Sequence, residues 1–149
     1  MRPPKQLRLI IEAADFDEAV HFYRDVLGMP EQPAFATGGD DRVSILNVGL
    51  ATIEIATREH IRNIDQIEGA PHGPSSKLRI ALEVDDTDSA VRATQDAGME
   101  LISGPVETPF RSLNARIQGP ASWQVTFFQE LESLEQRTQH DGFATDGER

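Results

Sequence analysis

The feature that most constrains the fold is an internal repeat with a shift of 71 residues. The segment "LRLIIEAADFDEAVHFYRD", from Leu7 to Asp25, aligns without a gap with "LRIALEVDDTDSAVRATQD", from Leu78 to Asp96. Eight of the nineteen aligned positions are identical. Self-similarity at a fixed shift is typical of a duplicated structural unit. The sequence therefore predicts two copies of one module in a single chain.

Each copy has the pattern of a strand followed by a capped helix. In the first copy, Asp15 is a predicted N-cap, and Glu18 three residues later completes a capping-box pattern. Apolar residues then recur at helical spacing until Gly28, a residue type that commonly ends a helix. In the second copy, Asp86 and Gly98 hold the equivalent positions. Both segments predict a strand, a tight turn and a helix.

Shorter alternating segments follow each helix. Val43–Val48 and Ala51–Ala56 predict one hairpin, and the stretch from Ile117 to Val125 predicts another around a Gly-Pro turn. Further strands are expected near residues 34–37 and 100–102. We expect one domain over residues 1–132, with modules at about 6–57 and 77–130. A linker over residues 58–76 holds a short helix, and residues 133–149 are expected to form a frayed helix and a disordered tail because they are polar and acidic.

Composition excludes several classes of function. The net charge of -11 argues against nucleic acid as a partner, because phosphate binding needs clustered Lys and Arg. The apolar runs are too short to span a bilayer, so no membrane partner is expected. The absence of Cys excludes thiolate chemistry and suits a reducing compartment, so we expect a cytoplasmic protein.

The segment "AADFDEAVHFYRDVLGM" resembles the first helix of glyoxalase, bleomycin-resistance and extradiol-dioxygenase proteins, which form the vicinal-oxygen-chelate superfamily. The resemblance rests on Asp15, Phe22, Tyr23, Leu27 and Gly28, and it covers roughly residues 7–130. It implies an α+β fold of two tandem βαβββ modules whose curved sheets surround a central cavity. It also implies a homodimer, since open sheets of this type leave edges that a second copy commonly covers.

The resemblance also implies four metal-ligand positions, on the first and last strand of each module. These positions fall on Arg8, Glu54, Arg79 and Thr126. Arg stays protonated and has no lone pair to give a metal, and one carboxylate with a hydroxyl is a poor site for zinc, nickel or iron. We therefore expect no metal and no other cofactor.

The four histidines do not supply a replacement site. His21 lies on the first predicted helix, His60 on the linker helix, His72 in a Pro/Gly-rich loop and His140 in the tail. No pair has the i, i+4 spacing of helical metal ligands. For each of them a structural or solvated role is favoured over ligation.

The alternation of side chains along the strands predicts which of them point into the cavity. The Leu/Ile face of each first strand must pack on its helix, so the opposite face points inwards. The residues expected there are Arg8, Glu12, Thr52, Glu54, Arg79, Glu83, Gln124 and Thr126. If Arg8, Arg79 and Glu54 converge, one positive charge is uncompensated. The cluster then either binds an anion such as a carboxylate or enolate, or forms an internal ion-pair network completed by Glu12 and Glu83.

The second module adds the segment "GPVETPFRSLNARIQGP". Phe110, Arg111, Asn114 and Arg116 could stack on and orient a planar ligand at the cavity mouth. Alternatively, this loop only covers the end of the sheet. Trp123, after a Gly-Pro turn, could line the cavity or close the hairpin.

Three classes of function remain open. The first is a protein that binds a small, possibly anionic, organic molecule in its cavity without the usual divalent metal. The alternative is an enzyme of the same fold, a glyoxalase-like lyase or isomerase or a dioxygenase, that uses a metal or an unidentified catalytic group. The third is a structural or regulatory partner protein with a vestigial cavity. Charged residues inside the cavity weigh against the third, since an unused cavity could fill with apolar residues.

Overall fold

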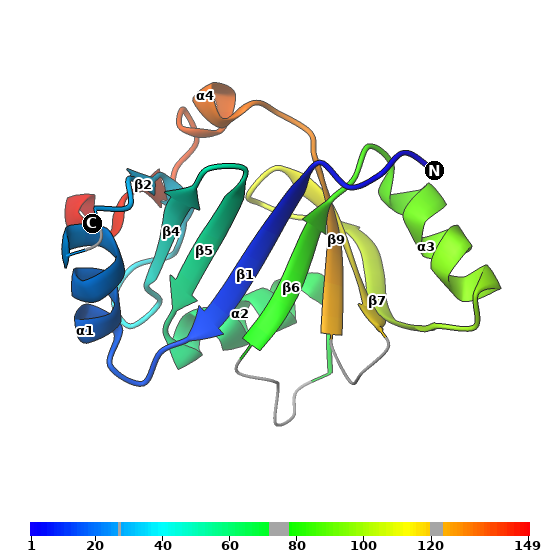
Figure 1. Cartoon of the computed structure of the whole chain (residues 1–149), viewed down its shortest axis with the longest axis horizontal. Coiled ribbons are helices and arrows are strands. Elements are labelled where there is room, and N and C mark those ends of the chain that lie inside the picture. Colours follow the sequence, from blue (N-terminus) through cyan, green and yellow to red (C-terminus); the bar gives the residue numbers. More distant parts are fainter. Residues whose placement is uncertain (27, 72–77, 120–123) are drawn as a thin grey trace.

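The computed structural model describes residues 1–26, 28–71, 78–119 and 124–149. Eight strands form one curved, open sheet (Figure 1) with the order β2-β4-β5-β1-β6-β9-β8-β7. The first module contributes β1 (Gln6–Glu12), β2 (Glu31–Gln32), β4 (Val43–Val48) and β5 (Ala51–Ala56). The second contributes β6 (Leu78–Glu83), β7 (Glu100–Glu107), β8 (Ser112–Gln118) and β9 (Gln124–Glu130).

The sheet repeats its own topology on either side of its centre. β1 lies parallel to β5, and β6 lies parallel to β9. The two modules join where β1 and β6 pair antiparallel, with Arg8 opposite Ala81 and Ile10 opposite Arg79. The predicted βαβββ duplication is confirmed, and the predicted hairpin strands Val43–Val48 and Ala51–Ala56 have the bounds of β4 and β5.

The helices of the two modules begin as predicted but differ in length. Asp15 accepts a hydrogen bond from the backbone N–H of Glu18, and Asp86 accepts one from that of Ser89. α3 (Thr87–Asp96) then runs as a regular helix. The first helix is α-helical only over α1 (Phe16–Val20) and continues as the π-helical turn η1 (His21–Val26). The wider turn replaces the regular helix expected up to Gly28, whose backbone has φ +71°.

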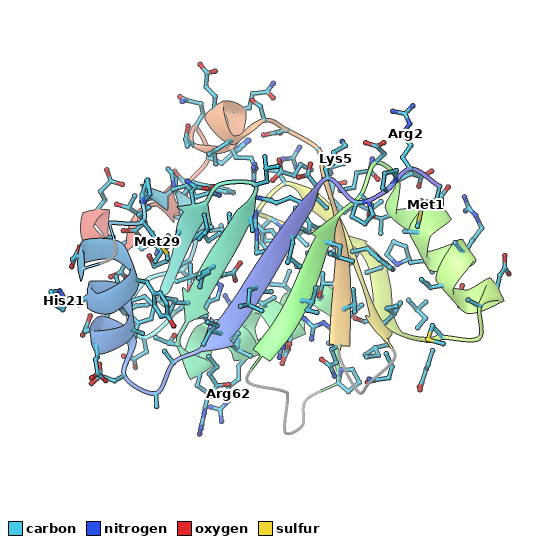
Figure 2. The ribbon with its side chains drawn as sticks, viewed as in Figure 1. Met1, Arg2, Lys5, His21, Met29 and Arg62 are labelled. Carbon is cyan, nitrogen blue, oxygen red and sulfur yellow. The ribbon has the colours of Figure 1, made fainter. Side chains whose placement is uncertain are left out.

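These helices cover one face of the sheet. Phe16 and Val20 of the first helix pack on Leu46 and Ile55. Around α3, the packing involves Ala90, Val91, Ile117 and Phe127. His21 points away from the sheet on the outer side of its helix (Figure 2). On this face Leu9 and Ile11 of β1 and Ile80 and Leu82 of β6 are half-buried, whereas Leu7 is exposed.

The linker contributes a further helix on the opposite face. α2 (Arg58–Glu68) begins at the N-cap Thr57 and ends at Gly69, which has φ +68°. Ile61 of α2 packs with Val43 and Ile45, whose side chains lie on the face that α1 does not cover. Arg62 points outwards from this helix (Figure 2). The helix expected within the linker is present, and it lies across the concave side of the sheet.

The C-terminal segment, residues 133–149, is folded and is not the disordered tail that the sequence predicts. It contains α4 (Leu134–Arg137), β10 (Phe143–Ala144) and the 3-10 turn η3 (Asp146–Glu148). β10 pairs with β3 (Ala34–Phe35), the short strand found near the one predicted at residues 34–37. Specific contacts hold the segment in place: Asp146 accepts two hydrogen bonds from Arg42 at 3.1 and 2.8 Å, and Phe143 packs on Phe35.

No helix in the described ranges is long and apolar enough to cross a membrane. The longest helix, α2, has 11 residues. A helix that spans the hydrocarbon core of a bilayer needs about 20 predominantly apolar residues.

Candidate functional site

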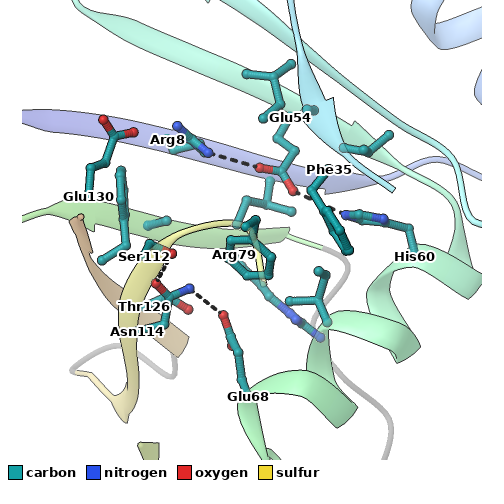
Figure 3. Close-up of a pocket in the computed structure, with 18 of the residues that line it drawn as sticks. Arg8, Phe35, Glu54, His60, Glu68, Arg79, Ser112, Asn114, Thr126 and Glu130 are labelled. Atoms are coloured by element: carbon teal, nitrogen blue, oxygen red, sulfur yellow. Dashed lines mark hydrogen bonds and ion pairs between the residues drawn. The ribbon is translucent and has the colours of Figure 1, made fainter. Parts of the chain in front are cut away.

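A cavity of about 90 Å³ lies between the sheet and α2 (Figure 3). Both modules contribute to its wall, and so do α2 and the C-terminal segment. Its charged and polar lining includes Arg8, Glu54, His60, Glu68, Arg79, Asn114, Arg116 and Thr126. Three phenylalanines form an apolar corner, because Phe35 lies 5.8 Å from Phe110 and 5.9 Å from Phe143 between ring centroids. The wall of the chamber therefore contains both charged and aromatic side chains.

The strand register brings the predicted cavity residues to one face. Arg8 lies beside Thr52 on β5 and opposite Ala81 on β6. Ala81 in turn lies beside Thr126, which is opposite Arg116. Residues that face each other across neighbouring strands point to the same side of the sheet. The cavity face that alternation predicted is thus the face that carries the cavity.

Arg79 and Arg116 belong to a buried ion network with α2. Arg79 donates to both carboxylate oxygens of Asp65, at 2.8 and 3.2 Å. Arg116 donates to Asp65 at 2.7 Å and also to Glu68. Glu68 accepts a further bond of 2.8 Å from Asn114. All five side chains are buried, and two carboxylates balance two guanidiniums.

Arg79 does not form one cluster with Arg8 and Glu54, as the sequence predicted, because its side chain belongs to this network. The charge of the Arg79 guanidinium is compensated, because Arg79 donates two hydrogen bonds to Asp65 on α2. Glu12 and Glu83 do not complete the network either: Glu12 pairs with Arg58 at 3.3 Å instead. The carboxylates that pair with Arg79 and Arg116 come instead from the linker helix α2. β6 and β8 each place one cation in the interior, and a buried cation is costly unless it is paired.

Arg8 and Glu54 form a separate and looser pair. Arg8 Nη1 lies 3.7 Å from Glu54 Oε2, and Arg8 Nη2 lies 3.5 Å from the side-chain oxygen of Gln6. Both distances are at or beyond the limit of a hydrogen bond. The guanidinium also lies over the ring of Phe128, 4.9 Å from its centroid. Arg8 is therefore held in place, but most of its donors are not engaged in strong hydrogen bonds.

His60 lies on the other side of Glu54. Its Nε2 is 4.0 Å from Glu54 Oε1, and its Nδ1 is 2.5 Å from Asp41 Oδ1. The imidazole is only 3% exposed. Glu54 thus has one carboxylate oxygen directed at Arg8 and the other at His60, as the dashed lines in Figure 3 show.

Asp41 is held by donors from three directions. Thr37 donates to it through its backbone N–H at 2.7 Å and through its hydroxyl at 2.6 Å, and Asn63 of α2 donates at 3.1 Å. Burial opposes ionisation of this carboxyl, but the hydrogen bonds from His60 and Thr37 outweigh it and hold its pKa well below the ordinary range. Asp41 is therefore an ionised acceptor that fixes the orientation of the His60 ring.

Not every predicted residue lines the cavity. Arg111 pairs with Glu132 at 2.8 Å and with Glu107 at 3.1 Å, away from the chamber, and Trp123 lies outside the described residues. The cavity lining contains Arg8, Glu54, Arg79, Phe110, Asn114, Arg116 and Thr126 but not Glu12, Thr52, Glu83 or Gln124. Burial raises the pKa of Glu83, and the nearby charge of Glu130 raises it further.

Residues 6–127 match the family model of the Glyoxalase/Bleomycin resistance protein/Dioxygenase superfamily. The chain belongs to this superfamily. No curated protein matches the sequence.

Several solved structures are similar to the chain in fold and only weakly similar in sequence. A hypothetical protein from Bacillus halodurans C-125 has a TM-score of 0.60 and 16% identity, and the match covers 87% of this chain and 95% of that one. Methylmalonyl-CoA epimerase from Mycobacterium tuberculosis has a TM-score of 0.59 and 18% identity over 90% and 91%. A variant of the Streptomyces coelicolor epimerase, solved with 2-nitronate-propionyl-CoA, has a TM-score of 0.59 and 14% identity over 89% and 99%. These likenesses support the fold alone.

The glyoxalase-superfamily metal does not fit the side chains present. Its four expected ligand positions hold two guanidiniums, one carboxylate and one hydroxyl, on Arg8, Arg79, Glu54 and Thr126. His60 adds one nitrogen near Glu54, but its other nitrogen is bound to Asp41. Within the described ranges, no group of three or more His, Cys, Asp or Glu side chains could hold a metal ion.

The sequence reasoning missed the site residues of α2 and of the C-terminal segment. His60, Asp65, Glu68 and Phe143 all lie at the cavity wall or in its ion network. A signal was present for α2: His60, Ile61, Ile64, Asp65 and Glu68 recur at spacings of three and four, so they share one face of a helix. For Phe143 the local sequence carries no comparable signal.

Proposed function

We propose that this protein binds a small organic molecule with an anionic oxygen, of carboxylate or enolate type, without a divalent metal. The observation that carries the proposal is the state of Arg8. Its side chain is 14% exposed and lines the cavity, yet its two nearest acceptors are 3.5 and 3.7 Å away. Guanidinium has five N–H donors, and burying them without partners is costly. A bound oxyanion would supply the missing acceptors.

The contrast with Arg79 supports this role for Arg8. The two guanidiniums occupy equivalent positions of the repeat, but Arg79 donates to Asp65 at 2.8 and 3.2 Å. The second module is thus closed by an internal carboxylate, whereas the first keeps a cation that has only a loose pair with Glu54 at the cavity wall. This difference favours a ligand site at Arg8 and a structural network at Arg79.

The rest of the wall favours a compact ligand with an apolar part. Phe35, Phe110 and Phe143 form an aromatic corner, and Phe128 lies under Arg8. Stacking on such rings suits a flat organic body whose charged end meets Arg8. The ligand of the Streptomyces coelicolor epimerase carries a nitronate, a planar anionic group, and the shared fold makes a similar group a reasonable occupant of this cavity.

The test is a thermal-shift screen with small organic acids such as pyruvate, acetoacetate and malonate. Ligands that bind only the folded state raise its melting temperature, by linkage. We expect stabilisation of the parent protein and of the matched surface variant Arg92→Met, and none of Arg8→Met. Stabilisation that survives in Arg8→Met, or a parent protein that responds to no acid, would contradict the proposal.

An enzyme of the same fold is the second candidate function. The observation that favours it is the buried His60, which lies against Glu54 at the cavity wall and is oriented by Asp41.

A further inference from the structure

One side of the cavity is closed by a segment that lies beyond residue 127, where the match to the family model ends. Residues 141–149, called the strap from here on, follow α4 and return to the first module, where β10 pairs with β3 (red in Figure 1). Phe143 of the strap lies opposite Phe35 of β3, and both side chains line the cavity. The strap is therefore part of the cavity wall.

The strap is held mainly by polar contacts near the surface. Asp146 accepts two hydrogen bonds from Arg42, and its backbone N–H donates to Glu31 at 2.8 Å. Arg149 donates to three backbone carbonyl groups. Every residue from 141 to 149 is half-buried or exposed. A segment with few buried apolar contacts opens at a much lower free energy than the core of a sheet.

The chain that leads to the strap is anchored independently. Arg137 of α4 is buried and pairs with Glu130 of β9 at 2.7 Å. The backbone N–H of Leu131 donates to the carbonyl group of Arg111 at 3.0 Å. Residues 139–141, which follow α4, are exposed. The strap can therefore move away at this exposed stretch while α4 keeps its contact with the sheet.

The packing under the strap does not depend on it. The apolar cluster beside β3 contains Ala34, Ala36, Val43, Ile45, Ala56 and Ile61, with Ile10 packed against it. Among the described residues this cluster includes none from the strap. When the strap leaves, the cluster keeps its own contacts, so the opening costs little apolar burial.

Gly142 determines how closely the strap approaches the cavity wall. Its backbone has φ +89°, and a methyl group at this position would lie 3.0 Å from two ring carbons of Phe35. The Gly142 carbonyl group accepts a hydrogen bond of 3.1 Å from the backbone N–H of Ala36. A larger residue would be strained in this backbone conformation and would push against the ring. The closed strap thus requires glycine at position 142.

We propose that the strap is a gate: it detaches from β3 by local unfolding, opens the cavity to a ligand and closes again, while both modules stay folded. Binding and release then proceed at the rate at which the strap opens. The purpose of the gate rests on the proposed binding function, but the opening itself can be measured without a ligand.

Introduced thiols measure the opening, because the chain has no Cys. Ala81→Cys places a thiol in the cavity wall, where Ala81 is 4% exposed, and Ala90→Cys places one under α3, where Ala90 is 0% exposed. Each protein reacts with 5,5′-dithiobis(2-nitrobenzoate) in urea below the unfolding midpoint. Local opening exposes little surface, so the cavity thiol should react faster and almost independently of urea. The thiol under α3 needs global unfolding, so its rate should rise steeply with urea.

Two glycines of the strap provide matched variants in the Ala81→Cys protein. Gly142→Ala should raise the labelling rate by roughly 10-fold, because the strained residue destabilises the closed strap. The raised rate should remain almost independent of urea. Gly147→Ala is the control, since its added methyl group meets no atom within 4 Å, and it should leave the rate unchanged.

Two results would overturn the gate. In the first, the cavity thiol follows urea as steeply as the thiol under α3, so the cavity opens only when the whole protein unfolds. In the second, Gly142→Ala and Gly147→Ala label at the same rate, so the strap does not control access. Either result leaves the binding function to the organic-acid screen. Gated labelling in a protein that responds to no acid would support the gate and contradict the binding function.

If Ala81→Cys does not fold, hydrogen exchange followed by mass spectrometry decides in proteins without introduced thiols. The Ala36 amide, which bonds to the strap, should exchange with little dependence on urea and faster in Gly142→Ala than in Gly147→Ala. An Ala36 amide that exchanges as slowly as the paired amides of β1 and β6 would overturn the gate.

Discussion

Arg79 and Asp65 form a two-point ion pair, with Nη1 2.8 Å from Oδ1 and Nη2 3.2 Å from Oδ2. The pair joins the second-module strand β6 to the linker helix α2. Arg116 on β8 shares Oδ1 of the same carboxylate at 2.7 Å. One aspartate therefore neutralises cations from two strands, and its loss leaves Glu68 as the one carboxylate of the network for two guanidiniums.

Replacing Asp65 with Asn should strongly destabilise the protein. The change leaves Arg79 and Arg116 buried with Glu68 as the remaining carboxylate of the network, and breaking a buried ion pair costs about 3–5 kcal/mol. Urea denaturation measures the loss as a lower midpoint. Asp25→Asn serves as the control, because Asp25 pairs with Arg24 at the surface, and its midpoint should hardly change. Equal midpoints for the two variants would contradict a dry network.

The protein should carry well under one equivalent of zinc, nickel, manganese or iron. Arg8, Arg79 and Thr126 stand where ligands would be needed, and none is a good donor. Elemental analysis of protein purified without chelator measures the content. A stoichiometric metal that is lost in Glu54→Gln would show that the site is a metal centre after all.

The contribution of Asp41 to stability should depend on pH in the acidic range. Its folded-state pKa lies below the unfolded value of about 4, so its stabilisation is fully present above that value and is lost as the pH falls towards the folded pKa. Comparing urea midpoints of the parent protein and Asp41→Asn should give a constant difference between pH 5 and pH 7. The difference should narrow below about pH 4. A difference that stays constant down to pH 2.5 would refute the expected shift.

Deleting residues 141–149 should destabilise the chain despite their polar sequence. Arg149 donates to the backbone carbonyls of Ala34 and Val43, and Asp146 pairs with Arg42. Leaving these groups without partners should cost on the order of 1–3 kcal/mol. Differential scanning calorimetry gives the change, and Arg149→Met should reproduce part of it. An unchanged melting temperature would indicate that the segment does not pack in solution.

A homodimer is the remaining prediction. The open sheet ends at β7, an edge strand of eight residues. In the described sheet β7 pairs with a neighbouring strand on one side only, so the backbone N–H and C=O groups of its outer side can pair with a second copy. Light scattering at micromolar concentration should therefore give twice the chain mass of 16.5 kDa. A mass equal to one chain would rule the dimer out.

The repeat, the helix caps and the cavity face were predictable because they depend on local patterns. Asp15 and Asp86 mark their helices through backbone hydrogen bonds within three residues, and alternation alone places Arg8 and Glu54 on one side of the sheet. The partner of Arg79 was not predictable in this way. Asp65 reaches it only because α2 folds back across the sheet, and that depends on tertiary packing.

The C-terminal segment shows the same limit more strongly. Composition indicates disorder, yet Phe143 packs on Phe35, and Arg149 reaches carbonyls more than a hundred residues away along the chain. Such contacts follow from where the ends of other elements lie, which no local pattern encodes. Trp123, a further predicted site residue, lies outside the described residues.

The position of α2 across the concave side of the sheet has an evolutionary consequence. A duplicated chain needs some connection between its halves, and here the connection itself supplies His60, Asp65 and Glu68 to the interior. Strand residues are constrained by pairing on both sides, whereas a connecting helix can change its inward face with fewer penalties. Relatives with the same sheet could therefore acquire different chemistry by exchanging this one segment, and grafting α2 between them should transfer ligand preference.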